Sequence, residues 1–289
     1  MSRIRTPLVL LLVQLCGQLF PGGLEGQHQL LLRYDPVRDV AVHTAFQTVT
    51  MVATGDGRVI ETADLGSMRA IALELEEGGT VLHMAYDSVR ARIRSEGGAW
   101  REFDVPDADS AWVQANIDDQ MRVSETSMGS RLPAVTGLLD ILTGVPDLVL
   151  PEQPVRAGGA WMAESELTER AVVSVPQEIG ELPSLTFSVR VTLDSAVQRT
   201  QDTLGFFTVS GYMRPTSEAD VQNLVDEGLT MSSEMTGQLV WSTGWQGFVS
   251  GVNRVTMEIS KSQPSPTPTI ERQEPELLVR VTTRFQVQP

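Results

Sequence analysis

Residues 185–193 read Leu185-Thr-Phe-Ser-Val-Arg-Val-Thr-Leu193, with apolar and polar side chains in unbroken alternation. Successive side chains of a β-strand point to opposite faces, so this pattern predicts a strand with one buried and one solvated face. Pairing shifted by one residue would expose every apolar side chain, so the alternation also specifies the register. The stretch predicts an antiparallel sheet with its core on one side.

The same period of two recurs along most of the chain. It is found in residues 38–53, 70–75, 81–93, 254–259 and 277–287. Turn-forming sequences separate several of these runs, namely Thr54-Gly-Asp-Gly57, Glu76-Glu-Gly-Gly79 and Ser95-Glu-Gly-Gly98. Short glycine-containing turns join antiparallel neighbours, so the order of runs and turns predicts a meander.

Helical patterns are scarce. Residues 217–228 are the main candidate, because Ser217 and Asp220 resemble a capping box and Gly228 can end the helix in a left-handed conformation. Residues 110–120 and 137–142 are two shorter candidates. The expected fold is therefore mainly β, with two antiparallel curved-sheet halves and one to three short helices.

Composition limits the classes of function. The chain has 289 residues, of which 41% are hydrophobic, and this is too apolar for a wholly disordered protein. The formal net charge is −15. An acidic surface repels phosphate backbones and anionic headgroups, which argues against nucleic acid or peripheral membrane binding.

Residues 1–26 have the pattern of a secretory signal peptide. Arg3 and Arg5 precede an apolar run at residues 8–16. Such a run is close to the roughly 7–15 residues of a signal-peptide core and short of the roughly 20 needed to cross a bilayer. No later stretch is long and apolar enough to span a membrane. We expect export to the periplasm, the outer envelope or the medium.

Cys16 is the one cysteine of the chain. A lipid anchor on its thiol would need small residues before it, and Gln14 and Leu15 do not meet that requirement. If Cys16 leaves with the signal peptide, the mature chain has no disulfide and no thiolate metal site. We expect neither a lipid anchor nor cysteine chemistry.

Residues 150–161 divide the expected strands into two halves, 27–149 and 150–289. Pro151 and Pro154 extend the chain, a Gly-Gly pair follows that permits a sharp reversal, and Trp161 opens the next strand with a large apolar surface. Within the second half, residues 261–275 contain four prolines. Proline cannot donate to a β-ladder, so we expect a mobile loop there.

This segment, Leu150-Pro-x-x-Pro-Val-x-x-Gly-x-x-Trp161, resembles one that introduces a β-rich second half in a family of exported bacterial proteins of unknown function. The resemblance covers most of the mature chain and brings no catalytic residues. Relatives often carry an acidic residue after the glycine, where this chain has Gly159. The strand-rich pattern is also similar to curved-sheet envelope proteins of the lipoprotein-carrier type, at the level of architecture.

The sequence does not indicate a metal site or a cofactor. The histidines are His28, His43 and His83. His43 and His83 could pair across a sheet, but two histidines without a third ligand do not define a zinc site. Residues 104–109 cluster carboxylates without the glycine and distal glutamate of a calcium loop. Phosphate-binding and dinucleotide-binding glycine motifs are absent from the sequence.

Catalytic patterns are equally absent. Residues 247–251 lack the Gly-x-Ser-x-Gly spacing of a nucleophile elbow and are typical of a strand bounded by turns. Trp241 and Trp245 could stack on sugar rings, although large aromatic side chains more often pack in cores. No spacing selects a catalytic pair from the acidic candidates, which are Glu61, Asp64, Glu74, Asp87, Glu164 and Glu166.

These observations favour a non-enzymatic exported envelope protein. Its curved sheet would hold a lipid-like ligand or a segment of a partner envelope protein in an apolar pocket of about several hundred Å3. One alternative is a structural or adhesive module that acts through strand edges or the loop 261–275. A further alternative is a hydrolase with a carboxylate pair that the sequence does not mark. The sequence leaves the oligomeric state open.

Overall fold

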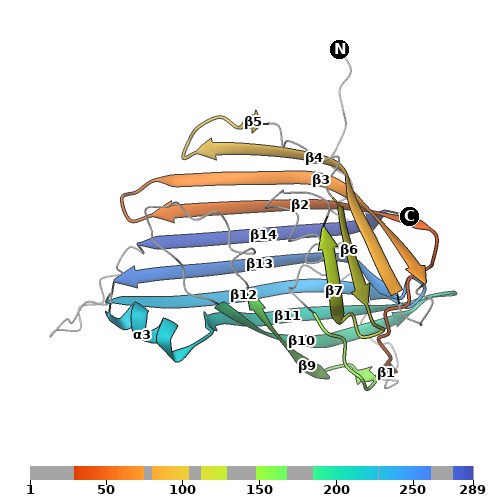
Figure 1. Cartoon of the computed structure of the whole chain (residues 1–289). Helices are drawn as coiled ribbons and strands as arrows, with labels where there is room; N and C mark the ends of the chain where they lie inside the picture. Colours follow the sequence, from red (N-terminus) through yellow and green to blue (C-terminus); the bar gives the residue numbers. More distant parts are fainter. Residues whose placement is uncertain are drawn as a thin grey trace, which may run out of the picture.

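The alternating stretch at residues 185–193 lies in β10 (Leu185–Gln198), near one end of a 12-stranded sheet. The computed structural model describes residues 29–74, 80–103, 112–128, 148–167, 185–226, 228–261 and 276–288. In these ranges the chain forms the large sheet, a two-stranded sheet and the helix α3 (Figure 1). The mainly β fold predicted from the sequence, with antiparallel meanders and few helices, is therefore confirmed.

The strand order of the large sheet is β7-β6-β4-β3-β2-β14-β13-β12-β11-β10-β9, and β5 pairs with β4. The first block contains β2 (Ala41–Thr54), β3 (Val59–Glu74), β4 (Thr80–Ser95), β5 (Arg101–Phe103), β6 (Trp112–Ile117) and β7 (Val123–Met128). The second contains β9 (Ala160–Leu167), β10, β11 (Thr203–Pro215), β12 (Leu229–Ser242), β13 (Gly247–Lys261) and β14 (Leu277–Gln288).

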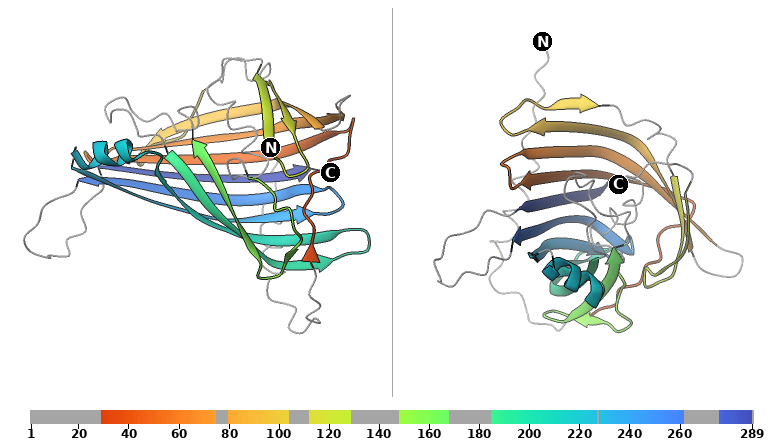
Figure 2. Two further views of the ribbon diagram at one scale, coloured as in Figure 1. Left: turned by 60° about the horizontal axis from the view of Figure 1, so that its bottom comes forward. Right: turned by 60° about the vertical axis from the view of Figure 1, so that its left-hand side comes forward.

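The two blocks form one continuous sheet, because β14 pairs antiparallel with β2. Figure 2 shows that the strands follow an arc, which gives the sheet a concave and a convex face. On β10 the predicted apolar positions from Leu185 to Leu193 are all buried, whereas Arg190 and Asp194 on the other face are exposed. The predicted alternation is confirmed, and it assigns the apolar side chains to the concave face.

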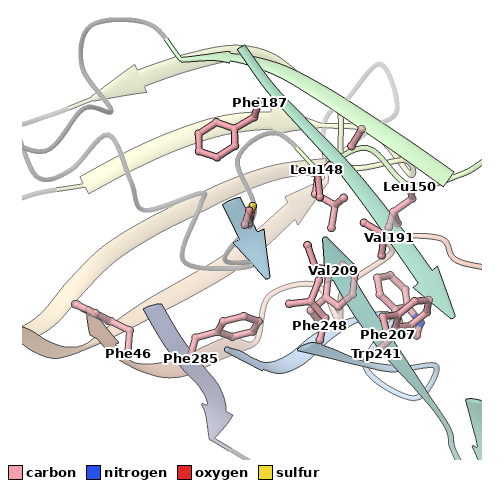
Figure 3. Close-up of a cluster of buried hydrophobic side chains, with 14 of the residues drawn as sticks. Phe46, Leu148, Leu150, Phe187, Val191, Phe207, Val209, Trp241, Phe248 and Phe285 are labelled. Carbon is pink, nitrogen blue, oxygen red and sulfur yellow. The ribbon is translucent and has the colours of Figure 1, made fainter. Parts of the chain in front are cut away.

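Aromatic side chains hold the centre of the core (Figure 3). The Trp241 and Phe248 rings meet edge to face at 5.1 Å, and the Phe207 ring lies 6.2 Å from that of Phe248. Trp161 meets Phe207 edge to face at 5.8 Å. Such contacts add about 0.5–1.5 kcal/mol each beyond the burial of area. The predicted packing role of Trp241, which is 1% exposed, is thus confirmed.

Two phenylalanines lie over glycines of the neighbouring strands. Phe46 on β2 pairs with Phe285 on β14, and the outer partners of this pair are Gly66 on β3 and Gly251 on β13. A Cβ atom at position 66 would lie 2.7 Å from the Phe46 ring, and one at position 251 would lie 2.6 Å from Leu239. The missing side chains therefore make room for the two rings where the blocks join.

The segment at residues 150–161 behaves as predicted. Its Val155–Arg156 portion is β8, which pairs with β1 (Gln29–Leu30). Gly158 has a φ of 77°, a left-handed conformation that supports the expected reversal. Trp161 then begins the buried side of β9, and its indole nitrogen donates to the Val149 carbonyl at 2.9 Å.

The predicted helix at residues 217–228 is confirmed as α3 (Glu218–Asp226). Ser217 Oγ accepts from the Asp220 amide at 3.1 Å, and Asp220 Oδ2 accepts from the Ser217 amide at 3.3 Å, as in a capping box. None of its side chains is buried, and it lies against β12 and β11 at one end of the sheet. The helix therefore does not cover the concave face.

The predicted helix at residues 110–120 is wrong, because β6 occupies residues 112–117. Val113, Ala115 and Ile117 are buried, whereas the intervening Trp112, Gln114 and Asn116 are only partly buried. The i+4 spacing of Val113 and Ile117 fits a strand equally well, since four is also a multiple of two. Pairing with β4 and β7 decides between the two structures.

The turns at residues 54–57 and 95–98 are confirmed. Other predictions lie outside the described residues: the signal peptide with Cys16, His28, residues 76–79, the carboxylates at 104–109, the helix at 137–142 and most of the loop 261–275. Within the described part of the chain, no helix is long and apolar enough to cross a membrane.

Gly251→Ala should destabilise the fold by about 1–3 kcal/mol, because the new methyl group would collide with Phe285 and Leu239 in the core. Chemical denaturation of the purified protein measures this change. Combining the substitution with Phe285→Leu should recover part of the loss, since it removes one of the colliding groups. Full stability of the single variant would contradict the packing described here.

Candidate functional site

The concave face is the candidate site, because its lining is apolar and comes from strands of both blocks. Methionine is prominent in it, and flexible, polarisable methionine side chains suit surfaces that adapt to varied apolar ligands. Six of the 11 methionines lie on this face, at positions 68, 84, 213, 231, 235 and 257, and all of them except Met231 are buried in the core. The convex face is polar by comparison, with exposed Arg254, Arg280 and Arg284.

Residues 31–40 run from β1 to β2 and are here called the strap; apart from a β-bridge between Arg38 and Ala72, they have no regular structure. The strap and the sheet enclose a cavity of about 60 Å3. Its strap wall is formed by Tyr34, Pro36 and Val37. The remaining walls come from five strands, Met121 and the turn before β13, namely Val42, Thr44, Ala70, Ala72, Leu82, Met121, Trp245, Gly247, Phe248, Val249 and Val287.

Two arginines hold the strap in place. The Arg33 guanidinium donates to the carbonyl oxygens of Pro151 at 3.0 Å and Glu152 at 2.6 Å, and its Nε lies 3.2 Å from Asp119. Arg38 pairs with Glu74 at 2.7 Å. These groups are partly exposed, so each ion pair contributes only a fraction of about 1 kcal/mol. The strap is held more firmly by Leu32, which is fully buried, and by backbone hydrogen bonds from the Tyr34 amide to Asp119 at 2.8 Å and from the Asp39 amide to Ala72 at 2.9 Å.

Thr44 is the one polar side chain of the sheet in the wall of this cavity. It is 1% exposed, and its Oγ1 has no hydrogen-bond partner among the described residues. Leaving a buried hydroxyl unsatisfied costs about 1–3 kcal/mol. A water molecule or a polar atom of a ligand in the cavity would remove this penalty.

The turn that carries Trp245 is fixed by Asp202. Its carboxylate accepts hydrogen bonds from Ser242 Oγ at 2.7 Å, Thr243 Oγ1 at 3.0 Å and the Gly244 amide at 2.7 Å. Burial by itself would raise the pKa of Asp202, but these hydrogen bonds bring it below its usual value. Trp245, 36% exposed, therefore belongs to the cavity wall, whereas Trp241 is part of the core.

One row of pairs across the sheet brings polar groups onto the concave face. Asp64 on β3 pairs with Thr48 on β2, Thr48 with Thr283 on β14, and Thr283 with Asn253 on β13. Paired side chains share a face, so all four lie on the side of Phe46. Burial raises the pKa of the partly buried Asp64 carboxyl above its usual value.

Tyr86 is the titratable neighbour of Asp64 on this face. Burial, with a smaller effect of the Asp64 charge, raises the pKa of Tyr86 to about 12. The Tyr86 ring packs 5.6 Å from that of Phe46. Its hydroxyl therefore stays neutral at physiological pH, and Asp64 carries the charge of this pair.

The two strand histidines do not pair across the sheet. His43 and His83 belong to β2 and β4, and β3 lies between these strands. His43 Nδ1 lies 2.8 Å from Asp87, and the His83 ring stacks on Trp112 at 5.6 Å. Within the described ranges, no three histidine, cysteine or acidic side chains gather as metal ligands.

The acidic candidates are dispersed. Glu61 lies on the convex face of β3, where it pairs with Arg94 at 2.6 Å, and Asp64 lies on the opposite face. Glu164 accepts from Ser188 Oγ at 3.2 Å. The side chain of Glu166 is not among those described. Residues 247–251 begin β13, as predicted for a strand bounded by a turn.

Sequence reasoning placed Asp64 among the acidic candidates without selecting it, and it missed the strap and Thr44. The sequence offered one indication of the strap. Tyr34 and Val37 have large apolar surfaces but stand in a run that lacks the apolar–polar alternation of a strand. The grouping of Asp64 with Thr48 and Thr283 depends on cross-strand register, which the sequence of a single strand does not reveal.

Neither family models nor curated proteins match this chain. Among solved structures, it is similar to lipovitellin, in a structure concerned with lipid–protein interactions, with a TM-score of 0.53 and 8% identity. The match covers 88% of this chain and only 26% of the lipovitellin chain. At this identity the likeness shows a shared fold, which agrees with the predicted carrier-like architecture.

A second match is DynF from the dynemicin biosynthesis pathway of Micromonospora chersina, at 8% identity. It covers 93% of this chain and 89% of DynF, but its TM-score is 0.22. A superposition of that quality carries no argument about fold or function.

Asp64→Asn should raise the thermal unfolding midpoint at about pH 7. Folding raises the pKa of the Asp64 carboxyl, so ionisation of this carboxyl at neutral pH destabilises the folded state, and the substitution removes that cost. The gain should shrink as the pH falls toward the unfolded-state pKa, where the carboxyl is protonated in both states. Melting curves of both proteins between about pH 4 and 8 test this. A variant that is less stable at every pH would show that the carboxylate supports the fold.

Proposed function

We propose that this protein binds an apolar, lipid-like chain on the concave face of its sheet and that binding, without catalysis, is its activity. The observation that carries the proposal is the continuous set of apolar side chains on the concave face, which 12 paired strands hold in place and which methionines from both blocks enrich. Most of these side chains are buried in this structure, so a ligand would replace the groups that now pack on them. Proteins bind apolar ligands in concave sites lined by hydrophobic side chains with few polar groups.

The likeness to lipovitellin supports the proposal in one respect. This chain shares its fold with 26% of the lipovitellin chain, whose structure concerns lipid–protein interactions. Fold alone does not define function, so the proposal rests on the lining of the concave face.

The strap is the element that ligand entry would move. The cavity of about 60 Å3 is much smaller than the pocket expected from the sequence. Pocket volumes for small molecules are about 300–1,000 Å3, so a chain-like ligand needs more room. Apart from the β-bridge at Arg38, residues 31–40 have no regular structure, and Val37 is 49% exposed. Displacing this segment would open the cavity and leave the pairings between strands of the large sheet intact, at the cost of the Arg38–Ala72 bridge and of the burial of Leu32.

We further propose that the protein acts in the cell envelope, where apolar molecules must cross an aqueous space. The support is the signal-like pattern of residues 1–26. The intact mass of protein recovered from an envelope fraction tests this, because cleavage would remove about the first 26 residues. A full-length mass from the cytoplasmic fraction would refute the assignment. Native mass spectrometry of the same sample would reveal any bound ligand.

Val281→Trp should weaken binding of the fluorescent apolar probe N-phenyl-1-naphthylamine by about tenfold or more, because the indole would fill the concave face. Val281 is partly buried on that face, between Thr50 and Val255. Fluorescence titration measures the affinity.

Thr282→Trp is the matched control, because the adjacent residue points to the convex face. This variant should bind the probe as the wild-type protein does, and circular dichroism should show that both variants are folded. Equal loss in the two variants, or no binding by the wild-type protein, would contradict the proposed site.

A further inference from the structure

Asp64 is a charged side chain near the middle of the concave face, among uncharged side chains. By register it pairs with Ala91 on one side and Thr48 on the other, and it shares the concave face with Phe46. Neither an ion pair nor a hydrogen bond joins it to another described side chain. The carboxylate is therefore available to a group that lies on this face.

Hydroxyl groups surround this carboxylate. Thr48 is its direct partner on β2, Thr62 lies two residues along β3, and Thr50 and Thr283 follow on β2 and β14. Hydroxyls both donate and accept hydrogen bonds, so they can hold either a hydrogen-bond donor or a hydrogen-bond acceptor of a ligand's head group next to Asp64. Apolar residues flank the group on β13 and β14, among them Val255 and Val281.

No positive charge balances Asp64 at the middle of the described strands on this face. The charged concave-side residues that the structure describes lie at strand ends or on the strap: Glu74 with Arg38, Arg33 with Asp119, Lys261 with Glu276, and Arg101 on β5. Arg101 is in register with Thr62, so it lies two strands across and two residues along from Asp64, or about 12 Å at the usual strand spacings. The interior of the lining therefore has a negative potential.

We infer that the ligand of the concave face is an amphiphile with a cationic amine head, which pairs with Asp64 while its alkyl chain lies on the apolar lining. This inference rests on the proposed function and specifies its ligand class. An ammonium group donates up to three hydrogen bonds, to the carboxylate and to the threonine hydroxyls beside it. A carboxylate or phosphate head would instead bring a second negative charge to a partly desolvated site.

The charge of the whole chain acts in the same direction. A net charge of −15 attracts cations and repels anions over the range of a Debye length, about 8 Å at physiological salt. Both the local and the global potential thus favour an amine over a fatty acid or an anionic phospholipid.

Three probes with the same alkyl chain test the inference: decylamine, decanol and decanoate, each below its micelle-forming concentration. Displacement of N-phenyl-1-naphthylamine from the purified full chain at about pH 7.5 gives their relative affinities. Decylamine should bind most tightly and decanoate least, with about tenfold or more between them, as expected for a partly screened charge contact. This comparison needs no variant and is unaffected by folding defects.

Asp64→Asn should bring the affinities of decylamine and decanoate within about twofold of each other, because the charge contact is removed, and it should leave decanol unchanged. Glu61→Gln is the matched control, since it removes the same charge from the convex face of the same strand. It should keep the wild-type order of affinities.

Decanoate binding as tightly as decylamine, or an unchanged preference in Asp64→Asn, would overturn the inference while leaving apolar binding established. Loss of the preference in Glu61→Gln would show that net charge, and not Asp64, selects the head group. If the naphthylamine probe and all three decyl compounds fail to bind the wild-type protein, the proposed function fails, and the inference fails with it.

Discussion

The structure depends on the alternation of apolar and polar side chains, because pairing in a sheet places alternate residues on opposite faces. β10 shows the rule clearly, with buried residues from Leu185 to Leu193 on the concave face and Arg190 on the convex face. Most strands are paired in the register that keeps their apolar set inside, although on β3 Ile71 and Leu73 lie on the convex face. The strands together form one lined surface. The candidate site is this surface, so fold and function have the same physical origin.

The junction of β2 with β14 is where the two blocks become one sheet. Phe46 and Phe285 pair there, and Gly66 and Gly251 leave room for their rings. Arg33 and the β1–β8 pairing connect the blocks a second time across the concave side. The lining is therefore continuous between the blocks, and the polar row through Asp64, Thr48 and Thr283 crosses the junction.

Strands, two turns and the helix α3 could be predicted from the sequence because each is encoded within a few residues. The segment from residue 110 to 120 was misassigned, since Val113 and Ile117 fit both periods and only pairing with β4 and β7 decides. The neighbours of Asp64 could not be predicted at all. Thr48 lies 16 residues away and Thr283 much farther, and only the register of the assembled sheet brings them together.

The central place of the last strand has a consequence for the order of folding. Ribosomes deliver β14 after every other described strand, and besides its sequence neighbour β13 it must pair with the distant β2. Contacts of such large sequence separation close late and slowly, because the entropy of a long loop is lost before the contact forms. Until then two unpaired edges are exposed, so a chain synthesised to its final residues would still depend on protection from aggregation.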